Sequence, residues 1–180
     1  MSLVVVFALV AGGIAAFSLL VDEALDEEVK RDRTCCWDKH ATVASVARRI
    51  GIRIPTSAID RRAGVKENDR QTVAVIAFTV PTRLAESYLA RLVPEDERMV
   101  APTWPDGSAP PEPDSTFRHL GLPEPSTVGP HSGVRTVNLC PDAAGKEAVH
   151  LKHCVDVYRL AVNGTADRTR LYFRSVVAGQ

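Results

Sequence analysis

An apolar run of 19 residues, Leu3 to Val21, constrains this sequence more than any other feature. The run contains no charged residue, and only Gly12, Gly13 and Ser18 interrupt its apolar character. A helix of that length would span about 28 Å, close to the ~30 Å hydrocarbon core of a bilayer. A helix buried inside a globular protein rarely lacks polar residues over five turns. The run therefore predicts a transmembrane signal anchor over residues 1–21.

The residues that follow the run bear on its orientation. No Lys or Arg precedes it, and the next twelve residues, Asp22 to Arg33, carry six acids against three bases. Acidic flanks count little in the positive-inside rule, so the pattern favours an extracytoplasmic C-terminal part only mildly. A removed signal peptide is the alternative, although a cut after Ala24 would place Asp22 where a small residue is typical. Acid-to-base pairs at i,i+4 predict a helical stalk over residues 22–40.

The charge balance excludes some classes of partner. The whole chain has 22 Lys+Arg and 22 Asp+Glu, and residues 34–180 carry 19 bases and 16 acids, a net of +3. A general nucleic-acid binder needs a stronger basic excess to neutralise phosphates, so we expect no nucleic-acid partner. The hydrophobic content of 45% is too high for a fully disordered chain. The neutral total is therefore an average over an anchor, an acidic collar and a mildly basic domain.

The rest of the chain, residues 41–180, predicts one α+β domain. Apolar residues at helical spacing from Val43 to Ile50, followed by Gly51, predict a short amphipathic helix. The β-branched run Thr72 to Val80 is apolar on both faces and predicts a central strand. The remaining elements are predicted at Ala58 to Lys66 (strand), Thr82 to Leu92 (helix), and Val134 to Leu139, His150 to Val162 and Arg168 to Val177 (strands). The order β-β-α-β-β-β implies an antiparallel sheet of about five strands with one or two helices on one face.

The pairing of the last two strands follows from their apolar positions. Val155 and Val157 lie on the same face as Leu171 and Phe173 only if paired residue numbers sum to an even value. A two-residue Asn-Gly turn would give an odd sum. We therefore expect a loop of three or five residues between these strands.

A proline-rich segment divides the predicted domain. Eight prolines lie between Pro102 and Pro130, so residues 101–133 predict an extended loop without regular structure. Trp104, Phe117 and Leu120 are the side chains expected to attach it to the core.

Four cysteines, Cys35, Cys36, Cys140 and Cys154, are disulfide candidates if the domain faces an oxidising exterior. Cys140 and Cys154 lie near the ends of successive strands and would close a 15-residue loop, worth about 3 kcal/mol. A vicinal Cys35–Cys36 bridge requires a strained ring and is rare. A cross-link from this pair to the sheet, or two free thiols, is an equal alternative, and in the cytosol all four would be reduced.

The region around the third and fourth cysteines also contains zinc-ligand types, namely Cys140, His150, His153 and Cys154. In a strand, His150 and Cys154 share one face while His153 points to the other, so they do not converge. We expect a disulfide with two surface histidines and no metal or cofactor.

A thiol enzyme is the other chemical alternative. Cys36 and His40, which with Asp38 also form a second small set of metal-ligand types, stand at i,i+4 and could pair in a helix. No third catalytic group or oxyanion loop accompanies the pair. The chain has no GxSxG, Gly-rich phosphate loop or HExxH motif. An enzyme is therefore less favoured than a binding domain.

The final predicted strand carries the one speculative binding surface. Arg159, Arg168, Arg170 and Arg174 could form a basic strip, with Tyr172 on the same face as Arg170 and Arg174. Such a strip is usually a solvated strand face. The alternative is a site for an anionic ligand of the cell envelope.

The segments "ARRIGIRIPTSAIDRR" and "TVAVIAFTVPTRLAESYLARL" resemble membrane-anchored actinobacterial (Streptomyces-like) proteins of the type with one N-terminal span. The resemblance covers residues 45 to 93 and rests on the "IP" segment and the "aFTVP" strand that runs into a helix. It implies a single-pass bacterial protein with a small extracytoplasmic domain, and it brings no activity or site. We expect a non-enzymatic binding or accessory domain at the cell envelope, with a thiol- or metal-dependent enzyme using Cys36/His40 or Cys140/His150/Cys154 as the alternative.

Overall fold

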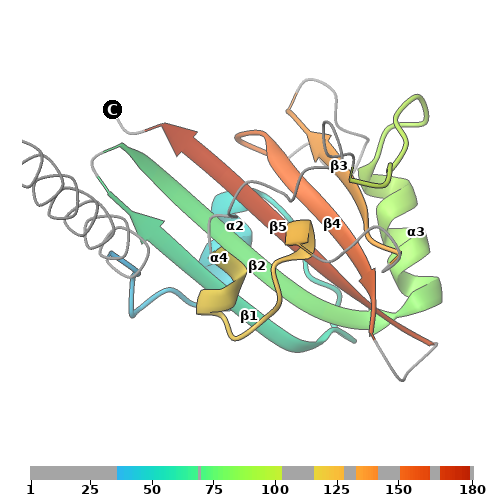
Figure 1. The fold of residues 1–180 in the computed structure, drawn as a ribbon, viewed down its shortest axis with the longest axis horizontal. Coiled ribbons are helices and arrows are strands. Elements are labelled where there is room, and N and C mark those ends of the chain that lie inside the picture. Colours follow the sequence, from blue (N-terminus) through green and yellow to red (C-terminus); the bar gives the residue numbers. More distant parts are fainter. Residues whose placement is uncertain are drawn as a thin grey trace, which may run out of the picture. The chain divides into compact units, whose positions relative to one another are not determined.

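The computed structural model describes residues 36–68, 70–102, 116–127, 133–141, 151–162 and 167–178 (Figure 1). The chain divides into two compact units, residues 1–36 and 37–180, and the second unit holds the sheet. Within the described ranges no helix is long and apolar enough to span a membrane. The predicted anchor and most of the predicted stalk lie outside these ranges.

The second unit is built on one five-stranded antiparallel sheet, which confirms the predicted α+β class. The strands occur in the spatial order β1-β2-β5-β4-β3, and each pair of neighbours is antiparallel. The sequence order is the predicted β-β-α-β-β-β, preceded by the predicted helix, with the short helices α4 and η2 added between α3 and β3. The elements are α2 (Val43–Ile50), β1 (Ile59–Glu67), β2 (Gln71–Pro81), α3 (Thr82–Leu92), α4 (Thr116–His119), η2 (Pro125–Thr127), β3 (Arg135–Leu139), β4 (Val155–Ala161) and β5 (Arg168–Ala178).

Helices α2 and α3 cover the first face of the sheet. Helix α2 ends at Gly51 with φ 91°, as the sequence predicted. It begins with a capping box between Thr42 and Ser45, which the sequence analysis did not identify. Helix α3 follows β2 directly and buries Tyr88 and Leu92 against the sheet. Together with the first-face residues of the strands, such as Phe78, these side chains form the larger hydrophobic core.

The register of β4 and β5 agrees with the prediction from apolar positions. Val157 pairs with Phe173 and Val155 with Ser175, so each pair of numbers sums to an even value. The Val162 N–H donates to the Arg168 carbonyl at 3.0 Å, which leaves a five-residue loop between them. The need to bury one apolar row therefore determined the loop length, despite the Asn-Gly signal.

The second face of the sheet is also covered, which corrects the expectation of helices on one face only. The segment 116–127, here called the α4 segment, lies on this face and contains α4 and η2 (Figure 1). The prediction of no regular structure within 101–133 is therefore wrong for these short helices. Phe117 is buried and Leu120 packs against the same cluster, as predicted, whereas Trp104 lies outside the described residues.

A C-terminal cap ends helix α4 and turns the chain back toward the sheet. The Gly121 N–H donates to the Arg118 carbonyl and the Leu122 N–H to the Phe117 carbonyl, with Gly121 at φ 68°. This is a Schellman arrangement in which Leu122 contacts the hydrophobic cluster that contains Phe117. The sequence F-x-x-L-G-L carries this signal, and the prolines around it concealed it.

The unit also begins earlier than predicted. Trp37 forms an isolated antiparallel bridge with Lys66, and the Asp38 N–H donates to the Val65 carbonyl at 2.8 Å. Residues 37 and 38 thus pair with the edge of β1 instead of continuing a helical stalk to residue 40. Edge pairing satisfies backbone groups of β1 that would otherwise be open to another chain.

Candidate binding face of the sheet

The second face of the sheet has an aromatic centre with charged side chains on both sides. Tyr172 of β5 is opposite Tyr158 of β4, and both lie in the smaller hydrophobic core with Phe117. Arg170 and Arg174 lie two residues before and after Tyr172 on β5. They share its face of the sheet, because alternate residues of a strand point to the same side. Along β5, this face thus has a buried aromatic residue with one arginine on either side of it.

The α4 segment is attached to this face by polar contacts at both ends of its helix. At the N-terminal end, the Glu124 carboxylate accepts hydrogen bonds from the backbone N–H groups of Phe117 (2.5 Å) and Arg118 (2.9 Å). At the C-terminal end, Arg62 Nη1 of β1 donates to the Leu120 carbonyl at 2.8 Å and the Gly121 carbonyl at 3.3 Å. An anion at the first turn and a cation at the last satisfy the unpaired groups of a helix.

A ring contact adds a third attachment. Trp37 stacks on His119 of α4 with 4.1 Å between ring centroids and 6° between ring planes. Gly64 of β1 lies beneath this pair, and a Cβ atom there would stand 2.9 Å from Cζ3 of Trp37. Burial lowers the pKa of His119, so the imidazole is held toward its neutral form. Position 64 requires a glycine, because the indole ring of Trp37 occupies the space of a side chain there.

Glu124 is the most buried carboxylate among the described residues, with 1% of its surface exposed. Burial raises the pKa of Glu124, and the N–H bonds from Arg118 and Phe117, with the charge of Arg174, oppose that rise. The hydrogen bonds therefore offset part of the free-energy cost of burying this carboxylate. Its role is that of a helix cap inside the core.

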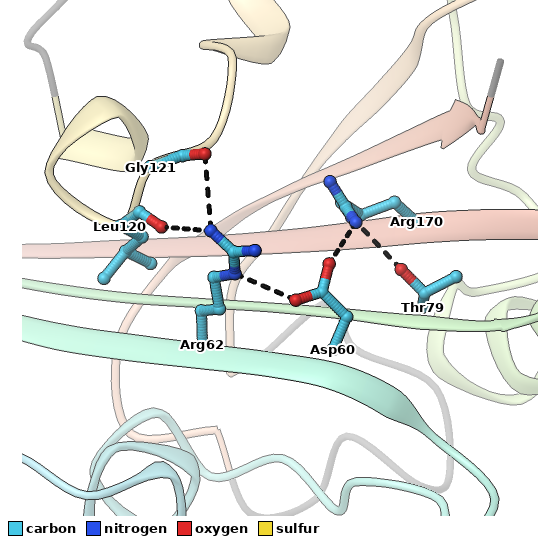
Figure 2. Close-up of polar contacts among 6 residues, drawn as sticks. All are labelled: Asp60, Arg62, Thr79, Leu120, Gly121 and Arg170. Atoms are coloured by element: carbon cyan, nitrogen blue, oxygen red, sulfur yellow. Dashed lines mark hydrogen bonds and ion pairs between the residues drawn. The ribbon is translucent and has the colours of Figure 1, made fainter.

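Figure 2 shows the first charged cluster, in which Asp60 joins two arginines. The Asp60 carboxylate accepts from Arg62 Nε at 2.9 Å and from Arg170 Nη2. Arg170 Nε donates in turn to the Thr79 hydroxyl at 3.1 Å, and Thr79 is buried. These residues come from β1, β2 and β5. We call Asp60, Arg62, Arg170 and Thr79 the Asp60 cluster.

A β-bulge places Asp60 in this cluster. The register between β1 and β2 shifts between Ile59 and Arg62, and Asp60 adopts φ 45°. Aspartate tolerates the left-handed region better than most residues, but the conformation is uncommon outside glycine. Bulges of this kind redirect a side chain, and here the result is a carboxylate between two guanidinium groups.

The second charged cluster lies on the other side of the tyrosines. Arg174 Nε and Nη2 donate to the same oxygen of Asp156 at 3.1 and 2.9 Å, and Arg174 Nη2 also donates to the Tyr158 hydroxyl at 3.1 Å. Asn138 Nδ2 donates to the other Asp156 oxygen at 2.8 Å. Burial raises the pKa of Tyr158, partly opposed by Arg174.

Tyr172 lies between the two clusters and is fully buried. Its hydroxyl forms no hydrogen bond with any group in the described part of the chain. Burial raises the pKa of Tyr172, and the charge of Arg170 opposes the rise.

The structure thus brings together the three residues proposed for the binding surface, and it changes their setting. Arg170, Tyr172 and Arg174 share one face, but Tyr172 is buried and both arginines hold carboxylates. Arg159 is not part of this strip, because it lies on the first face and pairs with Glu86 of α3 at 3.4 Å. The usual interpretation of a solvated strand face does not apply.

The three cysteines that lie in the described ranges are disulfide-bonded. Cys140 and Cys154 form the predicted disulfide, with Cα atoms 4.0 Å apart. Cys36 is also disulfide-bonded, so the Cys36/His40 thiol pair is not available as a nucleophile. The alternative of a metal site at Cys140, His150 and Cys154 is wrong for the same reason, because two of its three ligands are joined in a disulfide. Cys35 and His150 lie outside the described residues, and no group of three possible metal ligands occurs in the ranges that the structure covers.

Sequence reasoning missed the residues that complete the face. Asp60 and Arg62 lay within a predicted strand and were given no role, and Glu124 was one acid within a proline-rich stretch. The separation of 110 residues between Asp60 and Arg170 explains why no local pattern joined them. The bulge that redirects Asp60 had no signal in the sequence.

Comparison with known proteins identifies no family for this chain. No protein-family model, no curated protein and no solved structure matches the chain. Its function is therefore inferred from the contacts of the domain's own residues.

Proposed function

We propose that this chain is a single-pass protein of the cell membrane whose extracytoplasmic α+β domain is a non-enzymatic binding or accessory module of the envelope. The apolar run Leu3 to Val21 supports the anchor, because its length suits one membrane span. The acidic collar behind it, without a basic excess, is compatible with an exported domain.

The observation that carries the proposal is the Cys140–Cys154 disulfide. Structural disulfides persist in oxidising compartments and are rare in the cytosol. The same bond removes two of the ligands that a metal enzyme would use, and the bonded state of Cys36 removes the candidate nucleophile. A binding role is supported by the Asp60 cluster, where charged side chains from two strands, β1 and β5, meet at a partly exposed position.

Proteolysis of spheroplasts tests the location. The full chain, carrying a C-terminal epitope, is produced in a bacterial host, and intact spheroplasts are treated with protease. We expect loss of the epitope while a cytoplasmic marker stays intact. Protection of the epitope until the spheroplasts are lysed would overturn the proposal.

Thiol labelling tests the absence of thiol chemistry. Iodoacetamide at neutral pH is expected to label no cysteine of the natively purified chain, and to label Cys36, Cys140 and Cys154 after denaturation with a reductant. Rapid labelling of Cys36 before reduction would favour the thiol enzyme instead.

A further inference from the structure

The Asp60 cluster holds two guanidinium groups close together but uses only part of their hydrogen-bonding capacity. Arg62 donates through Nε and Nη1, and Arg170 donates through Nε and Nη2. Arg62 Nη2 and Arg170 Nη1 take part in none of these bonds. Each is a planar, permanently charged donor.

The two guanidinium groups lie close together, because both bond the Asp60 carboxylate. Figure 2 shows Arg62 and Arg170 on either side of that carboxylate, with the Leu120–Gly121 turn beside Arg62. The side chains of Arg62, Asp60 and Arg170 are 41%, 32% and 18% exposed, so solvent reaches the cluster. Guanidinium donors from two strands thus meet at one carboxylate that is partly open to solvent.

The charges and the backbone favour an anion there. Two guanidinium groups and one carboxylate leave one positive charge, and Thr79 beneath Arg170 is 3% exposed, which fixes the guanidinium from below. Asp60 holds both arginines only because the bulge places it in the left-handed region. Uncommon backbone conformations of this type concentrate at ligand sites, where the surrounding structure maintains them.

We propose that the Asp60 cluster binds a phosphate group, with Arg62 Nη2 and Arg170 Nη1 as its donors. Planar guanidinium donors match the oxygens of phosphate better than a single ammonium does. Asp60 orients the two arginines in the free protein and competes with the ligand for them. The group can come from free inorganic phosphate or from the headgroup of a phospholipid, which present the same oxygens. The inference deepens the proposed envelope binding role and rests on it.

Phosphate titration of the full chain in phosphatidylcholine nanodiscs tests the site. The thermal midpoint and the calorimetric heat are followed with sodium phosphate against sodium chloride at equal ionic strength. Arg170→Gln is expected to weaken the apparent phosphate affinity about tenfold, the loss of one charge-assisted hydrogen bond. Arg159→Gln is the matched control, because Arg159 is a partly exposed strand arginine that pairs with Glu86 on the opposite face.

Asp60→Asn separates binding from folding. Asparagine accepts the left-handed backbone at least as well as aspartate, so the bulge is retained. The substitution removes the competing charge, and we expect phosphate to bind about threefold more tightly. Equal phosphate affinity in the wild type, Arg170→Gln and Arg159→Gln, or loss of binding in Asp60→Asn, would overturn the proposal.

Nanodiscs that contain phosphatidylglycerol distinguish the two sources. If the cluster takes a lipid headgroup, inorganic phosphate binds more weakly in these discs than in phosphatidylcholine discs, and Arg170→Gln removes the difference. If it takes free phosphate, the two disc types give the same affinity. The titration does not depend on topology, so a negative result here leaves the spheroplast result standing, and the reverse also holds.

Discussion

Removal of the Glu124 side chain is the most direct test of how the α4 segment is held. The carboxylate is 1% exposed and accepts two backbone hydrogen bonds at 2.5 and 2.9 Å. In Glu124→Ala the N–H groups of Phe117 and Arg118 lose their acceptor inside the protein. A buried donor without a partner costs roughly 1–3 kcal/mol, and one of these two is only partly buried. We expect a destabilisation of about 3 kcal/mol.

Glu124→Gln refines the same test. The glutamine oxygen can still accept both bonds, while the substitution removes the buried charge and the charge-assisted part of the bonds. We expect a loss of about 1 kcal/mol, smaller than for alanine. Glu86→Ala is the control, because Glu86 is 56% exposed and its ion pair with Arg159 is a surface pair, worth about 0–1 kcal/mol.

Urea unfolding of the full chain in a non-ionic detergent measures these differences. Tryptophan fluorescence reports on Trp37, which stacks on His119 of the α4 segment. If Glu124→Ala unfolds within about 0.5 kcal/mol of the wild type, the carboxylate does not hold the α4 segment, since changes of that size are typical of uninvolved surface positions.

Three further outcomes follow from single contacts. Gly64→Ala places a Cβ atom 2.9 Å from the Trp37 ring, so we expect a loss of about 1–2 kcal/mol in urea unfolding, the balance of overpacking against reduced chain entropy. Cys140→Ser, which also frees Cys154, should cost about 3 kcal/mol by the same measurement. Because burial raises the pKa of folded Glu124, the folded state binds more protons than the unfolded state between the ordinary and the raised value. Wild-type stability relative to Glu124→Gln should therefore be highest below that window and fall as the pH rises through it, as paired urea titrations would show.

The sheet and the first layer of helices could be predicted because their signals are local. The buried run of β2 is β-branched on both faces, and the predicted bounds of α3, Thr82 to Leu92, equal the observed ones. Pro81 and Pro94 delimit that helix, since proline fits the start of a helix and stops its continuation. The hairpin register was predictable because a slip by one residue would have moved an entire apolar row to the other face.

The second layer could not be predicted because its contacts are distant in sequence. Helix α4 has four residues, too few for a periodic pattern, and it depends on Arg62, which lies 58 residues before Leu120. A helix of that length is not stable by itself, so tertiary contacts must supply its stability. The alternation of Arg170 and Arg174 indicated a shared face, but the bulge that provides Asp60 as a partner had no comparable signal.

The position of Arg62 links the proposed phosphate site to the α4 segment. One guanidinium caps α4 through Nη1 and offers Nη2 to the proposed ligand, so anything that fixes Arg62 in place favours both contacts. Binding to the folded state alone raises its stability, and coupling between two contacts is reciprocal. Glu124→Ala, which loosens α4 without touching the Asp60 cluster, should therefore weaken phosphate binding, whereas Arg159→Gln should not. Equal phosphate affinity in Glu124→Ala and the wild type would mean that Arg62 is held by Asp60 alone, and that the α4 segment is only a cover for the aromatic centre of the second face.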